Sequence, residues 1–169
     1  MSRASSSGWS WLPLAAGVIV ADQVVKAWIV HHFALFERVH ELRVLDIILT
    51  YNRGAAFSFL SDASGWQRWL FVILALAVSV ALIIWMRRLR ARVHALLACG
   101  LALIVGGALG NMLDRITTGR VVDFIHVHWG RHYFPAFNIA DSAITVGAVI
   151  LLIDAWLETR AAGRVQVHT

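Results

Sequence analysis

Long uninterrupted apolar runs dominate the pattern of hydrophobic and polar positions along this chain. Residues 4–21, 69–86 and 95–113 contain no charged side chain, and a run over residues 134–153 is interrupted only by Asp141. A helix of about 20 residues crosses a hydrocarbon core because it rises about 1.5 Å per residue. The pattern predicts an all-α integral membrane protein with four transmembrane helices, at about residues 10–30, 68–86, 95–113 and 137–157.

Composition agrees with this interpretation. Of the 169 residues, 59% are hydrophobic and 15% are charged, and the mean hydropathy is +0.70. Soluble domains contain about 45–50% apolar and about 25% charged residues. We therefore expect one membrane domain over residues 1–169. A cleavable signal peptide is the alternative for the first run, but that run is long and continues past Asp22 and Lys26 without a convincing cleavage site.

Basic residues predict the orientation of the spans. Four arginines, Arg87, Arg88, Arg90 and Arg92, lie in the loop 87–94, whereas the loop 31–67 mixes both charge signs. Because cytoplasmic loops carry the excess of Lys and Arg, loop 87–94 and both termini are expected in the cytoplasm, with loops 31–67 and 114–136 outside. The net charge of +5 is thereby explained by topology, and nucleic acid is not an expected partner.

The first outer loop contains two segments with strand character. Residues 42–51 and 55–60 are rich in Val, Ile, Leu, Phe and Thr, and a turn signal, Asn52-Arg53-Gly54, separates them. We expect these segments to fold back on each other as a small extracytoplasmic β-sheet formed by the outer loops and resting on the membrane surface.

Two aspartates flank the entrance to the fourth span. Asp123 lies in an extended Val-Val-Asp-Phe-Ile segment, and Asp141 shares one helical sector with Asn138, Ser142 and Thr145. Ionisable side chains at membrane depth are costly and mark functional sites. A polar stripe that only glues helices together is the structural alternative.

The end of the third span carries further polar residues. Gly106 and Gly110 form a small-xxx-small pair, which predicts close approach of another helix. Asn111 and Arg115 are four residues apart and so share a face. Asp114 is unfavourable beside a helix C-terminus, so we expect it to have a partner, with Arg115 or Arg120 the nearest candidates. A structural role is favoured for Asp114 and an active-site role for Arg115.

The remaining polar groups receive more modest interpretations. Asp22 and Lys26 are one turn apart near the outer end of the first span, and an ion pair that supports the site is expected. His126, His128 and His132 could bind zinc, but histidine is common in interfacial loops, and no metal or other cofactor is expected. Neither Cys99, in mid-span, nor Ser142, without an obvious base, suits a nucleophilic triad.

Two neighbouring carboxyl groups suffice for hydrolysis without a cofactor. Because the second charge is repelled by the first, one pKa rises and the other falls. The ionised member can then take a proton from water while the protonated member hydrogen-bonds a carbonyl oxygen, as in aspartic proteases.

Several motifs give the chain a family resemblance. In chain order they are Asp22-Gln23-x-x-Lys26, Asn52-x-Gly54-Ala55-Ala56-Phe57, Gly107-x-x-Gly110-Asn111-x-x-Asp114-Arg115, Gly119-x-Val121-Val122-Asp123-Phe124 and Phe137-Asn138-x-Ala140-Asp141-Ser142. This pattern resembles the bacterial lipoprotein signal peptidases, also called signal peptidase II, which are four-span membrane aspartyl peptidases.

The resemblance implies a specific activity and site. The family cleaves prolipoproteins before a diacylglyceryl-modified cysteine in the bacterial cytoplasmic membrane, near its outer face, and its catalytic aspartates match Asp123 and Asp141. Globomycin-type cyclic peptide antibiotics that occupy the site are further expected partners, besides membrane lipid. The residues implied to line or support the site are Asn52, Gly54, Asn111, Arg115, Asn138, Asp22 and Lys26.

Two other classes of function remain open from the residues alone. A small transporter or proton-coupled channel could use the carboxylates to bind a cation, although the polar residues cluster at one boundary instead of forming a path. A membrane scaffold whose polar residues only pack is the other alternative.

Overall fold

The computed structural model describes residues 7–54, 65–130 and 132–166. A short 3-10 helix, η1 (Gly8–Trp11), leads into α1 (Leu12–His32), and α2 (Trp66–Arg88), α3 (Ala95–Thr118) and α4 (Ile139–Gln166) follow along the chain. The strands are β1 (Arg38–Leu42), β2 (Leu45–Asn52), β3 (Val121–Trp129) and β4 (His132–Tyr133). Within the described residues, four helices are long and apolar enough to cross a membrane, as the apolar runs predict.

Helix α3 forms the centre of the bundle, and it packs against each of the other three long helices. Close approach depends on its glycines: a Cβ at Gly106 would lie 2.8 Å from the carbonyl oxygen of Ala15 in α1, and one at Gly107 would overlap the carbonyl oxygen of Ala140 in α4. The predicted role of Gly106 in packing is therefore confirmed. Small residues of this kind let helix backbones approach closely in membrane bundles.

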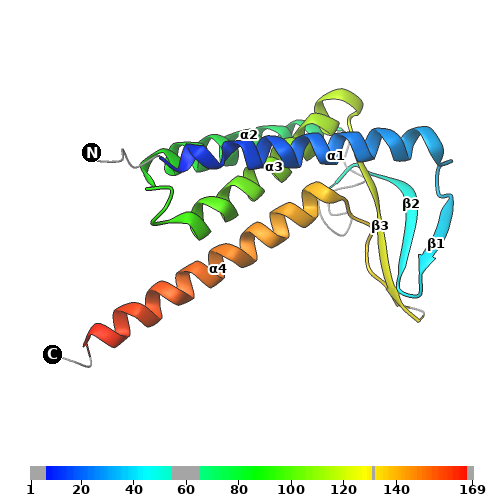
Figure 1. Ribbon diagram of the computed structural model, residues 1–169. Helices are drawn as coiled ribbons and strands as arrows, with labels where there is room; N and C mark the ends of the chain where they lie inside the picture. Colours follow the sequence, from blue (N-terminus) through cyan, green and yellow to red (C-terminus); the bar gives the residue numbers. More distant parts are fainter. Residues whose placement is uncertain (1–6, 55–64, 131, 167–169) are drawn as a thin grey trace.

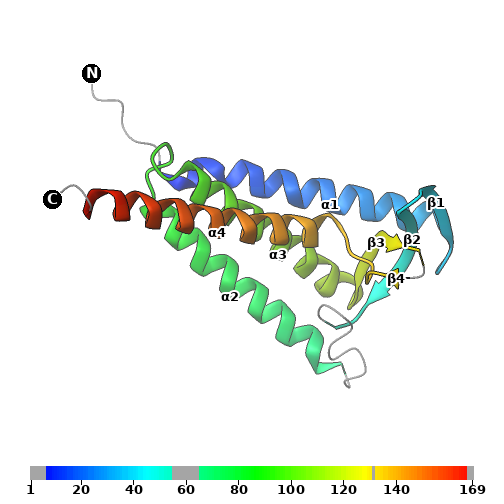
Figure 2. The same ribbon diagram turned by 90° about the horizontal axis from the view of Figure 1, so that it is seen from below.

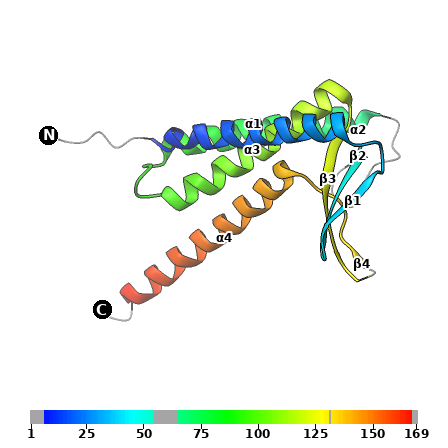
Figure 3. The same cartoon turned by 45° about the vertical axis from the view of Figure 1, so that its right-hand side comes forward.

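The outer surfaces of the helices are apolar. Val20, Val24, Ile73 and Leu152 are each at least 60% exposed. Such surfaces are matched to lipid tails, which are as apolar as the side chains themselves. Helix α4 diverges from the bundle toward its C-terminal end (Figures 1 and 3), and α2 diverges toward the end that faces the sheet (Figure 2).

The described strands form one antiparallel sheet in the order β1-β2-β3-β4. The predicted strand over residues 42–51 largely corresponds to β2. Among the described residues, β2 pairs with the preceding β1 and with the distant β3. The other predicted strand, residues 55–60, lies outside the described residues. Pairing with β3 could not be read locally, since it joins segments about 70 residues apart.

The sheet lies across one end of the bundle, close to the beginning of α4 (Figure 1). An apolar cluster joins it to the first helix: Ile29 of α1 packs with Leu49 of β2 and with Val122 and Phe124 of β3. At the opposite end, η1 is held to the turn between α2 and α3 by a hydrogen bond from the Gly8 amide to the Leu89 carbonyl (3.0 Å). The arginine-rich loop and the sheet are therefore at opposite ends of the bundle.

Candidate active site

Asp123 and Asp141, the carboxylate pair, line one cavity of about 850 Å³ between the sheet and the helix ends. Asp123 lies in the third position of β3 and is 3% exposed. Asp141 is the third residue of α4 and is half-buried. The strand and the helix thus bring together two side chains that are 18 positions apart in sequence.

Asn138 connects the two aspartates. It directly precedes α4, and its Oδ1 accepts the Asp141 amide at 2.9 Å, which is the usual N-cap contact with the third helical residue. Its Nδ2 donates to Oδ1 of Asp123 at 2.7 Å. Since the Asn138 side chain is fully buried, both contacts are shielded from water. One side chain therefore begins the helix and fixes the carboxylate of Asp123.

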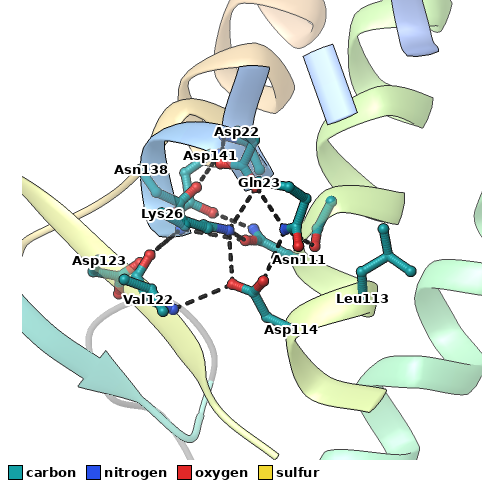
Figure 4. A network of polar contacts seen from close by, with 12 residues as sticks. Asp22, Gln23, Lys26, Asn111, Leu113, Asp114, Val122, Asp123, Asn138 and Asp141 are labelled. Atoms are coloured by element: carbon teal, nitrogen blue, oxygen red, sulfur yellow. Dashed lines mark hydrogen bonds and ion pairs between the residues drawn. The ribbon is translucent and has the colours of Figure 1, made fainter. Parts of the chain in front are cut away.

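A second amide, Asn111 of α3, holds Asp141. Its Nδ2 donates to Oδ1 of Asp141 at 2.7 Å, and its Oδ1 accepts from Lys26 at 3.0 Å and from Asn138 at 3.2 Å. The Asn52 side chain also hydrogen-bonds Asp123. Each carboxylate thus receives side-chain hydrogen bonds from neutral amides (Figure 4).

The setting of Asp123 favours its protonated form. Burial, and then the repulsion of Asp141, raise the pKa of its carboxyl from 3.8 to about 7. The hydrogen bonds from Asn138 and Asn52 and the charge of Lys26 oppose this shift of the Asp123 pKa, but they are outweighed. A carboxyl with a pKa near neutrality can both hold and release a proton at physiological pH.

Arg115 lines the same cavity, and its guanidinium binds backbone carbonyls. It donates to the carbonyl oxygen of Gly54 at 2.9 Å and to that of Asn111 at 3.4 Å, and it lies 5.0 Å from the centre of the Phe71 ring. The Gly54 amide in turn donates to Oδ1 of Asn52 at 2.9 Å. Arg115 and Gly54 therefore hold the end of β2 against α3.

Asp22, Lys26 and Asp114 form one buried ion cluster. The Lys26 ammonium lies 2.7 Å from Oδ2 of Asp22 and 2.8 Å from Oδ2 of Asp114. The pair of Asp22 with Lys26 was predicted. The predicted partners of Asp114, Arg115 or Arg120, were wrong, because the partner comes from another helix and is brought close by the packing of α1 on α3.

The histidines belong to the outer part of the sheet. The rings of His126 and His128 lie 5.1 and 5.2 Å from that of Tyr133, and Nε2 of His128 lies 3.3 Å from the buried Asp46 carboxylate. Burial, and then the nearby Arg38, lower the pKa of His126. In the described part of the chain, no group of three or more His, Cys, Asp or Glu residues is arranged to hold a metal ion.

The cavity wall includes residues that sequence reasoning did not assign to the active site. They are Ile48, Thr50, Tyr51, Val121, His126, Ile144, Val146 and residues 134–137, besides Ser142 and Thr145 of the predicted polar stripe. The apolar members resemble ordinary core or lipid-facing positions in sequence. Only the alternation of side chains along β2 could have indicated that Ile48, Thr50 and Asn52 share a face.

Together, the fold and the site define a class of protein. Buried paired carboxyls, held by amides at one end of a bundle of membrane-spanning length, are suited to general acid–base hydrolysis.

The chain belongs to the signal peptidase II family: the family model described as "Signal peptidase (SPase) II" matches residues 14–157. It is 53% identical over 146 residues to the lipoprotein signal peptidase of Pseudomonas fluorescens, covering 85% of each chain. It is also 53% identical over 146 residues to that of Pseudomonas aeruginosa, covering 85% of this chain and 86% of the relative. A solved structure of a bacterial membrane enzyme superimposes with a TM-score of 0.79 at 32% identity over 89% of both chains. These matches do not support the transporter alternative.

Proposed function

We propose that this protein is a membrane aspartyl endopeptidase that removes the signal peptide from prolipoproteins, with Asp123 and Asp141 as its catalytic residues. The observation that carries the proposal is the cavity lined by both carboxyls, in which Asn138 and Asn111 fix one oxygen of each. Family membership indicates that the reaction is hydrolysis of a peptide bond. The carboxylate pair can provide the acid and the base that this reaction needs.

The reaction follows from a pair that shares one proton. The ionised carboxylate takes a proton from a water molecule, whose oxygen adds to the scissile carbonyl carbon, while the protonated carboxyl hydrogen-bonds the carbonyl oxygen. The tetrahedral intermediate then collapses, the C–N bond breaks, and the leaving amine receives a proton from the pair. The products are a signal peptide with a free carboxyl group and a lipoprotein with a free amino group.

The walls of the cavity suit a lipidated substrate. Phe134, Phe137, Ile144 and Val146 contribute apolar surface beside the polar pair. An acyl chain transferred from the bilayer to such a surface stays in an apolar environment, while the peptide reaches the carboxyls. We therefore propose cleavage just before a diacylglyceryl-modified cysteine, and we expect globomycin-type cyclic peptides to compete for the same cavity.

The charge distribution supports an extracytoplasmic position for this site. Arg87, Arg88, Arg90 and Arg92 lie at or after the end of α2, at the end of the bundle opposite the sheet. By the positive-inside rule that end faces the cytoplasm. We propose that the carboxylate pair and the sheet lie at the outer boundary of the bacterial cytoplasmic membrane, with both termini inside.

The decisive experiment is cleavage of a lipid-modified prolipoprotein by the purified protein. Asp123→Asn and Asp141→Asn should each reduce product to background, because neither variant can share a proton within the pair. Asp154→Asn, on the same helix but outside the cavity, is the matched control and should cleave at the wild-type rate.

Two further arms sharpen this experiment. Prolipoprotein without the lipid should be cleaved poorly, and an excess of chelator should leave the rate unchanged. A wild-type cleavage rate in Asp123→Asn or in Asp141→Asn would contradict the assignment of the carboxylate pair as the catalytic residues. Inhibition by the chelator would contradict a metal-free mechanism and would direct attention to the histidines of β3.

A further inference from the structure

The carboxylate pair is connected to a second group of polar residues, the lysine cluster, which consists of Asp22, Gln23, Lys26 and Asp114. It lies between α1 and α3 (Figure 4). Asp22 is 0%, Lys26 3% and Asp114 6% exposed. None of these residues lines the cavity, so the hydrolytic chemistry does not use them directly.

Each aspartate of the lysine cluster binds the backbone next to one member of the carboxylate pair. Oδ1 of Asp22 accepts the amide of Ala140 at 2.9 Å, directly before Asp141 in the chain. Oδ2 of Asp114 accepts the amide of Val122 at 3.2 Å, directly before Asp123. The same contact thus occurs twice, once on the helix and once on the strand that carry the pair.

Lys26 joins these two contacts. Its ammonium lies 2.7 Å from Asp22 and 2.8 Å from Asp114, and it also donates to Oδ1 of Asn111 at 3.0 Å. The other end of that amide donates to Asp141 at 2.7 Å. The ammonium is therefore linked to Asp123 through Asp114 and the Val122 amide. It is linked to Asp141 in two ways, through Asp22 and the Ala140 amide and through the Asn111 side chain.

The residue type matches this geometry. An ammonium has three N–H donors that point in different directions, and here three oxygens from three side chains receive them. A guanidinium is planar and larger, and it suits a two-pronged contact with one carboxylate. Lys26 is the only lysine in the chain, whereas the other 14 basic residues are arginines.

Stability alone is a poor explanation for the lysine cluster. Two carboxylates and one ammonium are withdrawn from water, and buried ion clusters can often be replaced by apolar residues without loss of stability. Gln23 adds donors to Oδ2 of Asp22 (3.3 Å) and to Oδ1 of Asp114 (2.8 Å), which completes the hydrogen bonding of both carboxylates. A fully bonded polar group of this kind gives a defined relative position to the segments that it joins.

We propose that Lys26 is a positioning residue: by binding Asp22 and Asp114 together, it sets the relative position of the two backbone segments that carry the carboxylate pair. This inference rests on the proposed peptidase function. It assigns Lys26 no contact with substrate, because it acts through the Ala140 and Val122 amides and through Asn111.

The main test separates charge from geometry with Lys26→Arg. This variant keeps the positive charge but cannot place donors on the same three oxygens. We expect kcat to fall by about 100-fold, as for a misplacement of about 1 Å, with KM within threefold of the wild type. Arg92→Met, which alters an exposed arginine in the loop after α2, is the control and should leave both constants unchanged. A Lys26→Arg enzyme with the wild-type kcat would overturn the proposal.

A second measurement distinguishes positioning from a general role in folding. The charged groups around Asp123 are Asp141 from α4, Lys26 from α1, and Arg115 and Asp114 from α3, of which Asp114 accepts the adjacent Val122 amide. Removing the Lys26 charge (Lys26→Met) should shift the basic limb of the pH–rate profile to higher pH. Asp114→Asn, which removes a nearby negative charge, should shift it to lower pH.

If the lysine cluster had only a structural role, its variants would contain less active enzyme but would keep the wild-type position of the basic limb of the pH–rate profile. An unchanged basic limb in both variants would therefore overturn the proposal. If Lys26→Met does not fold, Asp114→Asn and Lys26→Arg decide the question. A wild-type protein that cleaves no prolipoprotein would instead refute the proposed function, which keeps the two failures distinguishable.

Discussion

Two pairs of aspartates at the same end of the bundle have different neighbours. Asp22 and Asp114 share the Lys26 ammonium and are sealed between α1 and α3. Each accepts hydrogen bonds from a backbone amide, from the Gln23 side chain and from the Lys26 ammonium, which together stabilise its negative charge. Such carboxylates are suited to holding structure, because each joins the backbone of a neighbouring segment to the same ammonium.

Asp123 and Asp141 line the cavity and repel each other. Their described side-chain hydrogen bonds come from the neutral amides of Asn138, Asn111 and Asn52. A carboxyl in that setting can keep a proton into the neutral range, as the raised pKa of Asp123 indicates. The neighbours, not the residue type, therefore separate a structural aspartate from one suited to catalysis.

The largest effect on the cleavage rate is expected when the Asn138 side-chain amide, which contacts both members of the carboxylate pair, is replaced by a charged carboxylate. Asn138→Asp keeps an N-cap oxygen for the Asp141 amide but puts a third carboxylate beside Asp123. We expect the cleavage rate to fall by about 1,000-fold, at the upper end of effects for loss of one preorganised donor. Thermal unfolding in detergent should also show a loss of stability, because the helix cap is kept but a buried carboxylate without its former donor contacts is placed beside Asp123.

Asn138→Ala is the matched variant for this comparison. It removes both the cap and the donor, so we expect a similar loss of rate together with a loss of about 1 kcal/mol of stability. An Asn138→Asp enzyme that keeps more than a tenth of the wild-type rate would break the distinction between the two aspartate pairs.

A smaller effect is expected where the backbone that carries Asp141 meets α3. A Cβ at Gly107 would overlap the Ala140 carbonyl, so Gly107→Ala must displace the start of α4. We expect a loss in kcat of about 100-fold, because small displacements of reacting groups have effects of that size. Gly17→Ala is the control, since nothing lies within 4 Å of its added Cβ. Equal rates for the two variants would show that the placement of Asp141 is not sensitive to this contact.

The smallest effect is the pH dependence of the wild-type enzyme. With the pKa of Asp123 raised to about 7, the pair keeps its shared proton below that pH and loses it above. We therefore expect kcat/KM to fall by about tenfold per pH unit above neutrality, because the acid form is lost. A profile that stays flat to pH 8.5 would contradict this assignment.

The same shift has a consequence for stability. Between pH 3.8 and about 7 the folded protein holds a proton on Asp123 that the unfolded chain has released. The contribution of this group to the free energy of unfolding therefore decreases as pH rises through that window. Unfolding of the wild type and of Asp123→Asn, compared at pH 5 and 8, would measure it.

The sequence by itself determined the four apolar helices and the residues that deserved chemical interest. A run of about 20 uncharged residues has one stable arrangement in lipid, because only a helix satisfies its backbone hydrogen bonds locally. Asp123 and Asp141 were identifiable because charge is rare in such a chain. Gly106 was identifiable as a packing residue because its spacing from Gly110 is a local property of one helix.

The tertiary structure decided which polar groups meet. The pairing of β2 with β3 joins segments about 70 residues apart, and Lys26 reaches Asp114 across the α1–α3 interface. Neither contact has a local signal, which is why the sequence did not indicate the pairing of β2 with β3 and why the predicted partner of Asp114 was wrong. The hydrophobic pattern specifies which face of a helix or strand is buried, but only the packing of these elements determines which neighbour a buried charge has. That neighbour determines whether an aspartate stabilises the fold or exchanges a proton.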